Sequence, residues 1–118
     1  MLIQIMKCKL HKAQITYAHL DYEGSITIDE ELMEMAGLLP GEKVQVVNKN
    51  NGERLETYVI VGERGKHQIG LNGPAARKGM VGDEVVIISY ALMTPEEAQS
   101  FKPKVIVLGE NNAVIRTL

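Results

Sequence analysis

Apolar and polar residues alternate with a period of two over most of this chain, the pattern of half-buried β-strands. The alternation predicts strands over residues 2–6, 9–16, 44–47, 53–61, 67–71, 85–92, 105–108 and 113–115. These strands are short and are separated by turns rich in glycine and asparagine. Many short strands with such turns favour a small closed β architecture.

Two short segments depart from this alternation and have the features of helices. In the first, Asp29 caps the start and Gly37 closes the end. Its expected apolar face consists of Leu32, Met35 and Ala36. The second begins with the capping box Thr94-Pro95-Glu96-Glu97, with proline at the first helical position.

The connections between the expected strands carry their own signals. Asn50-Asn51-Gly52 predicts a tight hairpin, because Asn-Gly suits a type I′ turn. Residues 18–21 and 62–66 are predicted to be loops, and residues 109–112 a turn.

Residues 40–46 (PGEKVQV) are similar to residues 81–87 (VGDEVVI), and their glycines are 41 positions apart. Each segment is a glycine–acid turn followed by an apolar strand. Two similar β units around one core indicate a barrel with pseudo-two-fold symmetry. At 118 residues, the chain has the usual size of a single domain, residues 1–118.

Composition narrows the class of protein further. The chain is 45% hydrophobic but only 4% aromatic, so the core must be built mainly from aliphatic side chains. The net charge of −2 gives no general attraction to nucleic acid or to anionic membranes. The single cysteine, Cys8, is expected to be a buried apolar residue and fits a reducing cytoplasm. No apolar run approaches the ~20 residues of a membrane span, and no charged segment precedes the apolar start as in a signal peptide.

The chemistry of the chain is expected to centre on the Gly24–Ser25 bond. A serine hydroxyl that is aligned with the preceding carbonyl can attack it and convert the amide to an ester. Such alignment can be worth ~10⁵–10⁸ M in effective concentration. Gly24 suits the attack because it lacks a β-carbon and reaches backbone conformations closed to other residues.

Five motifs together resemble the bacterial aspartate 1-decarboxylase family over nearly the whole chain. They are Lys9-Leu10-His11, Tyr22-Glu23-Gly24-Ser25, Asn51-Gly52-Glu53-Arg54, Thr57-Tyr58 and Asn72-Gly73. The resemblance implies decarboxylation of L-aspartate to β-alanine and CO₂, for pantothenate and coenzyme A biosynthesis. It also implies a six-stranded double-psi β-barrel with short helices. The implied assembly is a homotetramer with sites between subunits, and a maturation factor is a further partner to consider.

The same resemblance implies self-cleavage between residues 24 and 25, giving a small β chain (1–24) and a larger α chain (25–118). Ser25 would become a covalent pyruvoyl group, whose carbonyl accepts the amine of aspartate and serves as the electron sink when CO₂ leaves. No metal is then needed, and His11, His19 and His67 lack the spacing of metal ligands.

The family assigns roles to further residues. Arg54 and Lys9 would bind the substrate carboxylate, and Tyr58, with its reference pKa of ~10, would donate a proton after CO₂ leaves. Thr57 would activate the Gly24 carbonyl and also contact the substrate. Asn72 would position the pyruvoyl group or the substrate, with Gly73, Pro74 and Ala75 as a backbone clamp. His11 and Tyr22 would line the site from a neighbouring subunit.

Some features of the sequence complicate this assignment. Alternation along residues 53–61 places Arg54 and Tyr58 on one face and Thr57 on the other. Pro74 replaces the alanine that is common in the family and offers no N–H donor. Val47 stands where many relatives have tryptophan, so one wall of the site would be less bulky.

Two alternatives come from other functional classes. Residues 28–44 resemble a DNA-binding transition-state-regulator module in the order of their expected elements, which are a short helix, a Pro-Gly turn and a strand. Those proteins are much shorter and present a basic face, unlike this chain. The second alternative is a β-barrel binding protein in which the Gly24–Ser25 bond stays intact.

Overall fold

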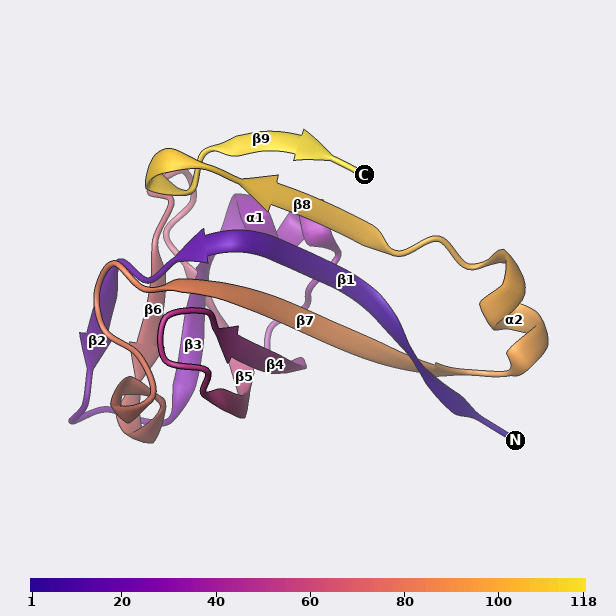
Figure 1. Ribbon diagram of the computed structural model, residues 1–118, viewed down its shortest axis with the longest axis horizontal. Coiled ribbons are helices and arrows are strands. Elements are labelled where there is room, and N and C mark those ends of the chain that lie inside the picture. Colours follow the sequence, from indigo (N-terminus) through magenta and orange to yellow (C-terminus); the bar gives the residue numbers. More distant parts are fainter.

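The computed structural model describes residues 1–118 as nine strands, two α-helices and two short 3₁₀ helices (Figure 1). The strands are β1 (Ile3–Gln14), β2 (Tyr17–His19), β3 (Ser25–Asp29), β4 (Lys43–Asn48), β5 (Arg54–Gly62), β6 (Ile69–Asn72), β7 (Glu84–Met93), β8 (Lys104–Leu108) and β9 (Val114–Thr117). The helices are α1 (Glu30–Ala36), η1 (Gly73–Arg77), α2 (Pro95–Ser100) and η2 (Glu110–Asn112). The strands are ordered β2-β6-β3-β5-β4-β7-β1-β8-β9.

The six central strands, from β6 to β1 in this order, form a closed arrangement. Thr16, just beyond β1, bridges the two ends of the series. Its N–H donates to the Ile69 carbonyl at 2.7 Å, and its Oγ1 accepts from the Ile69 N–H at 3.0 Å. The buried core of aliphatic residues fills the interior, as period-2 alternation on each strand requires.

The six strands have the predicted pseudo-two-fold relation. The chain passes from β3 through α1 to β4, and β5 then pairs between β3 and β4. On the other side, the chain passes from β6 through η1 to β7, and β1 lies between β7 and β6. The two glycine–acid turns make matching bonds. The Gly41 N–H donates to the Val59 carbonyl at 2.7 Å, and the Gly82 N–H donates to the Ile15 carbonyl at 2.8 Å. Both glycines have positive φ, at 83° and 94°.

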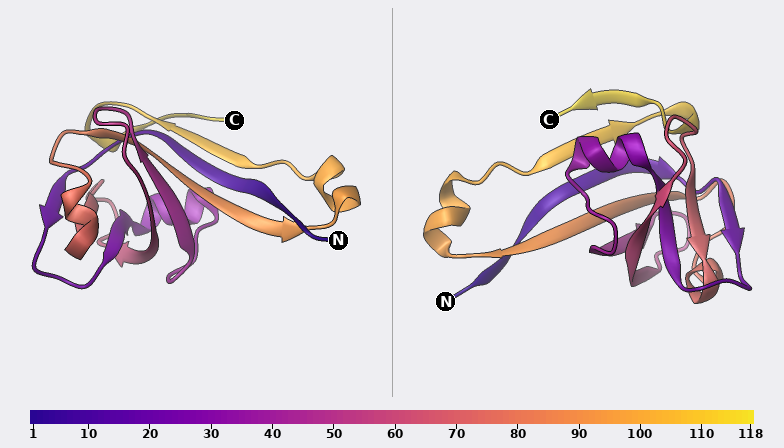
Figure 2. Two further views of the ribbon diagram at one scale, coloured as in Figure 1. Left: turned by 60° about the horizontal axis from the view of Figure 1, so that its bottom comes forward. Right: turned by 180° about the vertical axis from the view of Figure 1, so that it is seen from behind.

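An arm projects from the barrel, which makes the molecule elongated, with extents of 42 × 28 × 25 Å. β1 and β7 run side by side beyond the barrel toward the N-terminus, and α2 lies at the tip of the arm (Figure 1). Viewed from behind, β8 follows β1 and passes beside α1, with β9 on its outer edge (Figure 2). Neither α-helix has the length or the apolar run that crossing a membrane requires.

The predicted helix signals are confirmed. Asp29 accepts the Glu31 N–H, Gly37 ends α1 with φ of 76°, and Thr94 opens α2 with both bonds of the capping box. The predicted apolar face of α1 was partly wrong, since Met33 is buried and Met35 is only half-buried against the core. Cys8 is fully buried as predicted and lies 3.1 Å from the Ser89 hydroxyl. Burial raises the pKa of its thiol.

Several predicted strand boundaries were wrong. The two strands expected at 2–6 and 9–16 are a single strand, because β-bulges absorb the irregular positions without ending the pairing. The expected loop at 18–21 begins with a short strand, since β2 pairs in parallel with β6. β6 starts at Ile69 rather than at His67, whose positive φ of 58° turns its N–H toward Asp29.

The predicted type I′ turn at Asn50-Asn51-Gly52 was also wrong. Of these three residues only Gly52 has positive φ, whereas a type I′ turn needs two such residues in succession. The Asn48 side chain explains the longer loop. Its Oδ1 accepts the N–H groups of Asn50 at 2.8 Å and Asn51 at 3.4 Å, so the turn is organised around Asn48.

Candidate functional site

Ser25 is the first residue of β3 and is only 1% exposed. Its Oγ accepts a hydrogen bond from Asn72 Nδ2 at 3.0 Å, and the same amide donates to Thr27 Oγ1 at 2.9 Å. The Ser25 hydroxyl donates weakly to the Glu23 carbonyl at 3.4 Å, back toward the segment that precedes the Gly24–Ser25 bond. The buried hydroxyl is therefore held between a donor on β6 and the backbone before Gly24.

η1 presses its first residues against this backbone. Gly73 is buried and has φ of 66°, and a β-carbon there would come within 2.5 Å of the Tyr22 carbonyl oxygen and 2.8 Å of the Gly24 nitrogen. A β-carbon on Gly24 would lie 3.5 Å from the Pro74 ring. Only glycine permits this close approach at position 73, so the start of η1 lies directly against the backbone at Gly24.

A cleft of about 490 Å³ opens beside Ser25. It is lined by Tyr17, His19, Tyr22, Thr27, Ile60, Gln68 and Asn72. The Tyr17 ring lies on Gly70, where a β-carbon would overlap it, and it stacks obliquely on His19 with ring centroids 4.9 Å apart. This wall comes from β2, which the sequence did not predict as a strand.

Sequence analysis missed Thr27, Tyr17 and Gln68 as residues of this site. Thr27 had a detectable signal, because period-2 alternation in β3 places it on the same face as Ser25. Tyr17 and Gln68 had none, because pairing between distant segments brings them to the cleft. Tyr17 pairs with Gly70 in the parallel β2–β6 ladder, and the Gln68 carbonyl accepts the Asp29 N–H.

β5 carries Tyr58 and Thr57 past the Gly24–Ser25 bond. Ile26 pairs with Val59 in the parallel β3–β5 ladder, so the preceding positions, Ser25 and Tyr58, lie side by side in register. Tyr58 is 40% exposed and shares the outer face with Ile60, which lines the cleft. Thr57 points to the opposite face, as alternation predicts, and its cross-strand partner on β4 is the buried Val44.

Arg54 and Val47 are cross-strand partners, and Val47 pairs in turn with Val86. Arg54 is exposed and lies four residues before Tyr58 on the same face of β5, about 13 Å along the strand. It therefore does not meet Ser25 within one chain.

Lys9 and His11 share the outer face of β1, since their neighbours Cys8 and Leu10 are buried in the core. Lys9 pairs with Ile88 on β7, and Ile88 pairs with Gln45 on β4. Together with Arg54 and Val47, Lys9 and His11 form a second group on the outer face of β5, β4, β7 and β1. We call these four residues the outer-face group.

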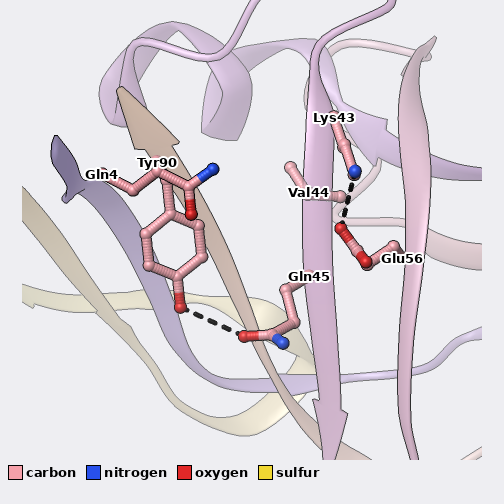
Figure 3. Close-up of a pocket in the computed structure, with 6 residues that line it drawn as sticks. All are labelled: Gln4, Lys43, Val44, Gln45, Glu56 and Tyr90. Carbon is pink, nitrogen blue, oxygen red and sulfur yellow. Dashed lines mark hydrogen bonds and ion pairs between the residues drawn. The ribbon is translucent and has the colours of Figure 1, made fainter. Parts of the chain in front are cut away.

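A second hollow of about 450 Å³ lies on this outer face (Figure 3). Tyr90 donates to Gln45 at 3.1 Å across it, and Lys43 pairs with Glu56 at 2.8 Å on the neighbouring strands. Both groups of this ion pair are more than 60% exposed, so its contribution to stability is small. Ser25 and Asn72 do not line this hollow, so the chemistry is assigned to the cleft beside Ser25.

The surroundings of His11 and Asp29 shift the pKa values of both side chains. Burial lowers the pKa of His11, and the nearby Lys9 and Lys12 lower it further, so its imidazole is neutral at pH 7. Its Nδ1 is buried and has no hydrogen-bond partner. Burial alone would raise the pKa of Asp29, but N–H donors from His67, Glu31 and Gly65 outweigh burial and hold it below its usual value.

One chain thus brings together part of the predicted site. The group around the scissile bond consists of Tyr22, Gly24, Ser25, Thr57, Tyr58, Asn72, Gly73, Pro74 and Ala75. Ala75 is buried within η1, and Tyr22 lines the cleft of its own chain. Lys9, His11 and Arg54 stay apart in the outer-face group.

The arrangement suits an electrophile built from Ser25. No group of three or more histidine, cysteine, aspartate or glutamate side chains has the geometry of a metal site. The Asn72 amide presents a donor to the Ser25 oxygen, and a donor at this place also fits the carbonyl oxygen of a pyruvoyl group. The residues present therefore fit such a group.

Comparison with known proteins identifies relatives over nearly the entire chain. The family model described as aspartate decarboxylase matches residues 1–115. An aspartate 1-decarboxylase of Caldicellulosiruptor saccharolyticus is 58% identical over 116 residues, covering 98% of this chain and 91% of the relative. One from Salinibacter ruber is 57% identical over 115 residues, covering 98% of this chain and 79% of the relative. The matched range includes residues 28–44, the segment that resembled a DNA-binding module.

Among solved structures, the computationally designed msDPBB_sym2 protein, a double-psi β-barrel, matches with a TM-score of 0.50 at 20% identity. The match covers 72% of this chain and 96% of the designed chain. This similarity concerns the fold alone. It confirms the prediction of a mainly β, double-psi barrel.

Proposed function

The chain belongs to the aspartate decarboxylase family, and we propose that it activates itself by cutting the Gly24–Ser25 bond before it decarboxylates L-aspartate to β-alanine. The observation that carries the proposal is the buried Ser25 hydroxyl. It follows Gly24 directly, accepts a hydrogen bond from Asn72, and lies where Gly73 presses on the backbone before the bond. A serine with only a structural role needs none of these features in combination.

The cut follows from the positions of these groups. The Ser25 oxygen attacks the Gly24 carbonyl carbon, the C–N bond breaks, and the hydroxyl proton passes to the released nitrogen, which leaves an ester. Loss of the Ser25 α-proton then expels the Gly24 carboxylate from the β-carbon. Addition of water and release of ammonia leave a pyruvoyl group at residue 25. The Asn72 N–H donates to the Ser25 oxygen and holds it in position for this attack.

Thr57 immediately precedes Tyr58 on β5, and β5 pairs in parallel with β3 from Val59 and Ile26 onward, so we place the Thr57 hydroxyl near Gly24. This position suits a hydroxyl that polarises the Gly24 carbonyl during the attack. Thr57 therefore keeps its proposed role in processing although it does not share the face of Tyr58.

A pyruvoyl group supplies a carbonyl that binds the substrate amine and withdraws electrons as CO₂ leaves. The chain's own residues hold the rest of the substrate. Arg54 presents a planar fork that suits one carboxylate, and Lys9 adds a second positive charge. Tyr58 lies beside residue 25 in register, and its phenolic O–H is a donor that suits delivery of a proton to the carbon that has lost CO₂.

The site needs a second copy of the chain. Lys9, His11 and Arg54 lie on the outer face of β5, β4, β7 and β1, away from Ser25 of the same chain. A neighbouring copy that seats its Ser25 cleft against this face completes the site, in a homotetramer with sites between subunits. We propose that the product of the decarboxylation, β-alanine, is made in the cytoplasm for pantothenate biosynthesis. A maturation factor that assists the cleavage is a further candidate partner.

Intact-mass spectrometry tests the proposal directly. Freshly made protein is incubated at neutral pH, and the masses of the fragments 1–24 and 25–118 are followed together with β-alanine release from aspartate. We expect both fragments to appear and β-alanine to form in proportion to the cut. A chain that stays whole, and that forms no β-alanine, would favour an uncut binding protein instead.

A further inference from the structure

η1 has two ends, and the end away from the scissile bond is fixed by a loop distant in sequence. Its first residue, Gly73, lies against the backbone of Tyr22 and Gly24. At its other end, the Lys78 N–H closes the helix on the Ala75 carbonyl at 3.0 Å. The carbonyl of Lys78 has no partner within the helix, as is usual for the last carbonyls of a helix.

Two asparagines supply the missing donors: Asn48, the last residue of β4, and Asn51, in the loop between β4 and β5. Asn51 Nδ2 donates to the Lys78 carbonyl at 2.9 Å, and Asn48 Nδ2 donates to the same oxygen at 3.2 Å. We call these two bonds the Lys78 anchor. The nearby ion pair of Lys78 and Glu53 at 2.8 Å is about half-exposed and adds little.

Asn48 is held rigidly in this role. It is only 3% exposed, and its amide also donates to Asp83 Oδ2 at 2.9 Å. Asp83 in turn accepts the Met80 N–H at 3.0 Å. The Asn48 amide is therefore connected to the backbone on both sides of Gly79, to Lys78 directly and to Met80 through Asp83. A β-carbon on Gly79 would lie 3.1 Å from Asn48 Nδ2, so the backbone that follows η1 passes close to this amide.

We propose that Asn48 and Asn51 are positioning residues for the self-cleavage at Gly24–Ser25, acting through η1. The Lys78 anchor fixes one end of a five-residue helix whose other end presses on the scissile backbone. An intramolecular attack depends steeply on alignment, and a misplacement of about 1 Å can cost ~10²-fold in rate. The inference rests on the proposed function, since it concerns the same cut.

Asn51 allows a test that spares the fold. Asn51→Asp keeps the Oδ1 that accepts the Glu53 N–H at 2.9 Å but loses the donor to Lys78. Asn50→Asp is the matched control. It is an exposed asparagine of the same loop with the same change of charge, it keeps the Oδ1 that accepts the Glu84 N–H, and it does not contact Lys78. Glu53→Gln is a second control, which removes the charge pairing with Lys78 and leaves both amide donors.

The rate of cleavage of fresh precursor is measured by intact mass, and the thermal midpoint is measured alongside. We expect Asn51→Asp to slow the cut by about 10- to 100-fold. Its midpoint should match that of Asn50→Asp, and both controls should cut at nearly the rate of the wild type. If the Lys78 anchor served stability alone, Asn51→Asp would have a lower thermal midpoint than Asn50→Asp, but the two variants would be cleaved at the same rate.

Two other outcomes overturn the inference and differ from each other. If the wild type cuts and Asn51→Asp cuts as fast as Asn50→Asp, the Lys78 anchor has no part in positioning, and the proposed function stands. If the wild type itself stays whole, the proposed cleavage is wrong and the positioning role falls with it.

Discussion

The antiparallel pair of β3 and β6 has two ends, related by the pseudo-two-fold axis, and they are built differently. At one end Ser25 pairs with Asn72, and at the other the Asp29 N–H donates to the Gln68 carbonyl at 3.0 Å. Asp29 ends β3 and precedes α1, whereas Asn72 ends β6 and precedes η1. The two residues therefore occupy equivalent places in the repeat.

The Asp29 end is organised for stability. The buried carboxylate accepts three backbone N–H groups, from Glu31, Gly65 and His67, at 2.8, 3.1 and 2.6 Å. Its neighbour on β5 is Gly62, where a β-carbon would come within 2.9 Å of Thr27.

At the Ser25 end, the position equivalent to Asp29 is occupied by Asn72, which has an amide side chain. Asn72 makes no cap bond to η1, and its Nδ2 donates to the Ser25 and Thr27 hydroxyls instead. The neighbour on β5 is Tyr58 rather than a glycine. A carboxylate can only accept hydrogen bonds, whereas an amide also donates. At this position an amide that donates to the Ser25 hydroxyl therefore replaces a carboxylate that caps a helix.

Removal of the Ser25 hydroxyl should have the largest effect and erase the difference between the two ends. We expect Ser25→Ala to give a folded chain that neither cuts itself nor turns over aspartate. The hydroxyl supplies the attack and adds little to packing. Intact mass and circular dichroism test this prediction, and two fragments from the variant would end the self-cleavage hypothesis.

Tyr58→Phe tests the neighbour on β5. The ring stays, so cleavage and the thermal midpoint should be unchanged, while β-alanine release should fall by ~10²–10⁴-fold because general acid catalysis is lost. Turnover is measured per cut chain by chromatography. A variant that keeps more than about half the normal rate would remove Tyr58 from the mechanism.

Asn72→Asp makes the Ser25 end resemble the Asp29 end. The donor to the Ser25 oxygen becomes a charged acceptor, and we expect the cut to slow by roughly 10²-fold, as for loss of one stabilising donor. Time courses of the intact precursor measure the rate. Cleavage at the normal rate would show that the Asn72 amide does not assist Ser25.

Arg54→Ala separates processing from substrate binding. A charge-assisted contact with a carboxylate is worth ~1.5–3 kcal/mol, so aspartate turnover should fall by roughly 10- to 100-fold. The cut should be unaffected because it involves no substrate. Steady-state kinetics on fully cut protein tests this, and near-normal turnover would make Arg54 an ordinary surface residue.

Asp29→Asn should have the smallest effect on chemistry and act on stability alone. We expect a loss of about 1.5–3 kcal/mol in the free energy of unfolding, because an NH₂ group would face backbone N–H donors that now bind a carboxylate. The cut and turnover should persist at 25 °C. A variant that unfolds like the wild type would show that the three bonds to Asp29 contribute little.

The difference in stability between the wild type and Asp29→Asn should depend on pH. The pKa of Asp29 is depressed in the folded state, so its contribution is present above the unfolded pKa of ~3.9 and is lost as pH falls through the lower folded value. The gap in stability between wild type and Asp29→Asn should therefore be constant at neutral pH and close below about pH 4. Denaturant titrations across this range measure it.

Local signals in the sequence were sufficient for much of the fold. Period-2 alternation located most of the strands but missed β3, whose five residues are all buried. The caps at Asp29, Gly37 and Thr94 act within a few residues of their own helices. The repeat of the two glycine–acid turns predicted the symmetry because each turn makes its bonds in the same way. The Asn50-Asn51-Gly52 signal failed since the side chain of Asn48 competes with the short turn.

The features of the candidate site also divide into those indicated by the sequence and those that depend on the fold. The sequence by itself determined the residue types: a Gly-Ser bond, an amide, a tyrosine and an arginine, each with chemistry that is intrinsic to its side chain. Only the tertiary structure decided that one Asn72 amide bonds both Ser25 and Thr27, that Tyr17 covers Gly70, and that Lys9 lies two strands away from Arg54's partner strand on the outer face. Alternation and capping are set by neighbours in sequence, whereas these contacts depend on the register between strands that are distant in the chain, and no local pattern encodes that register.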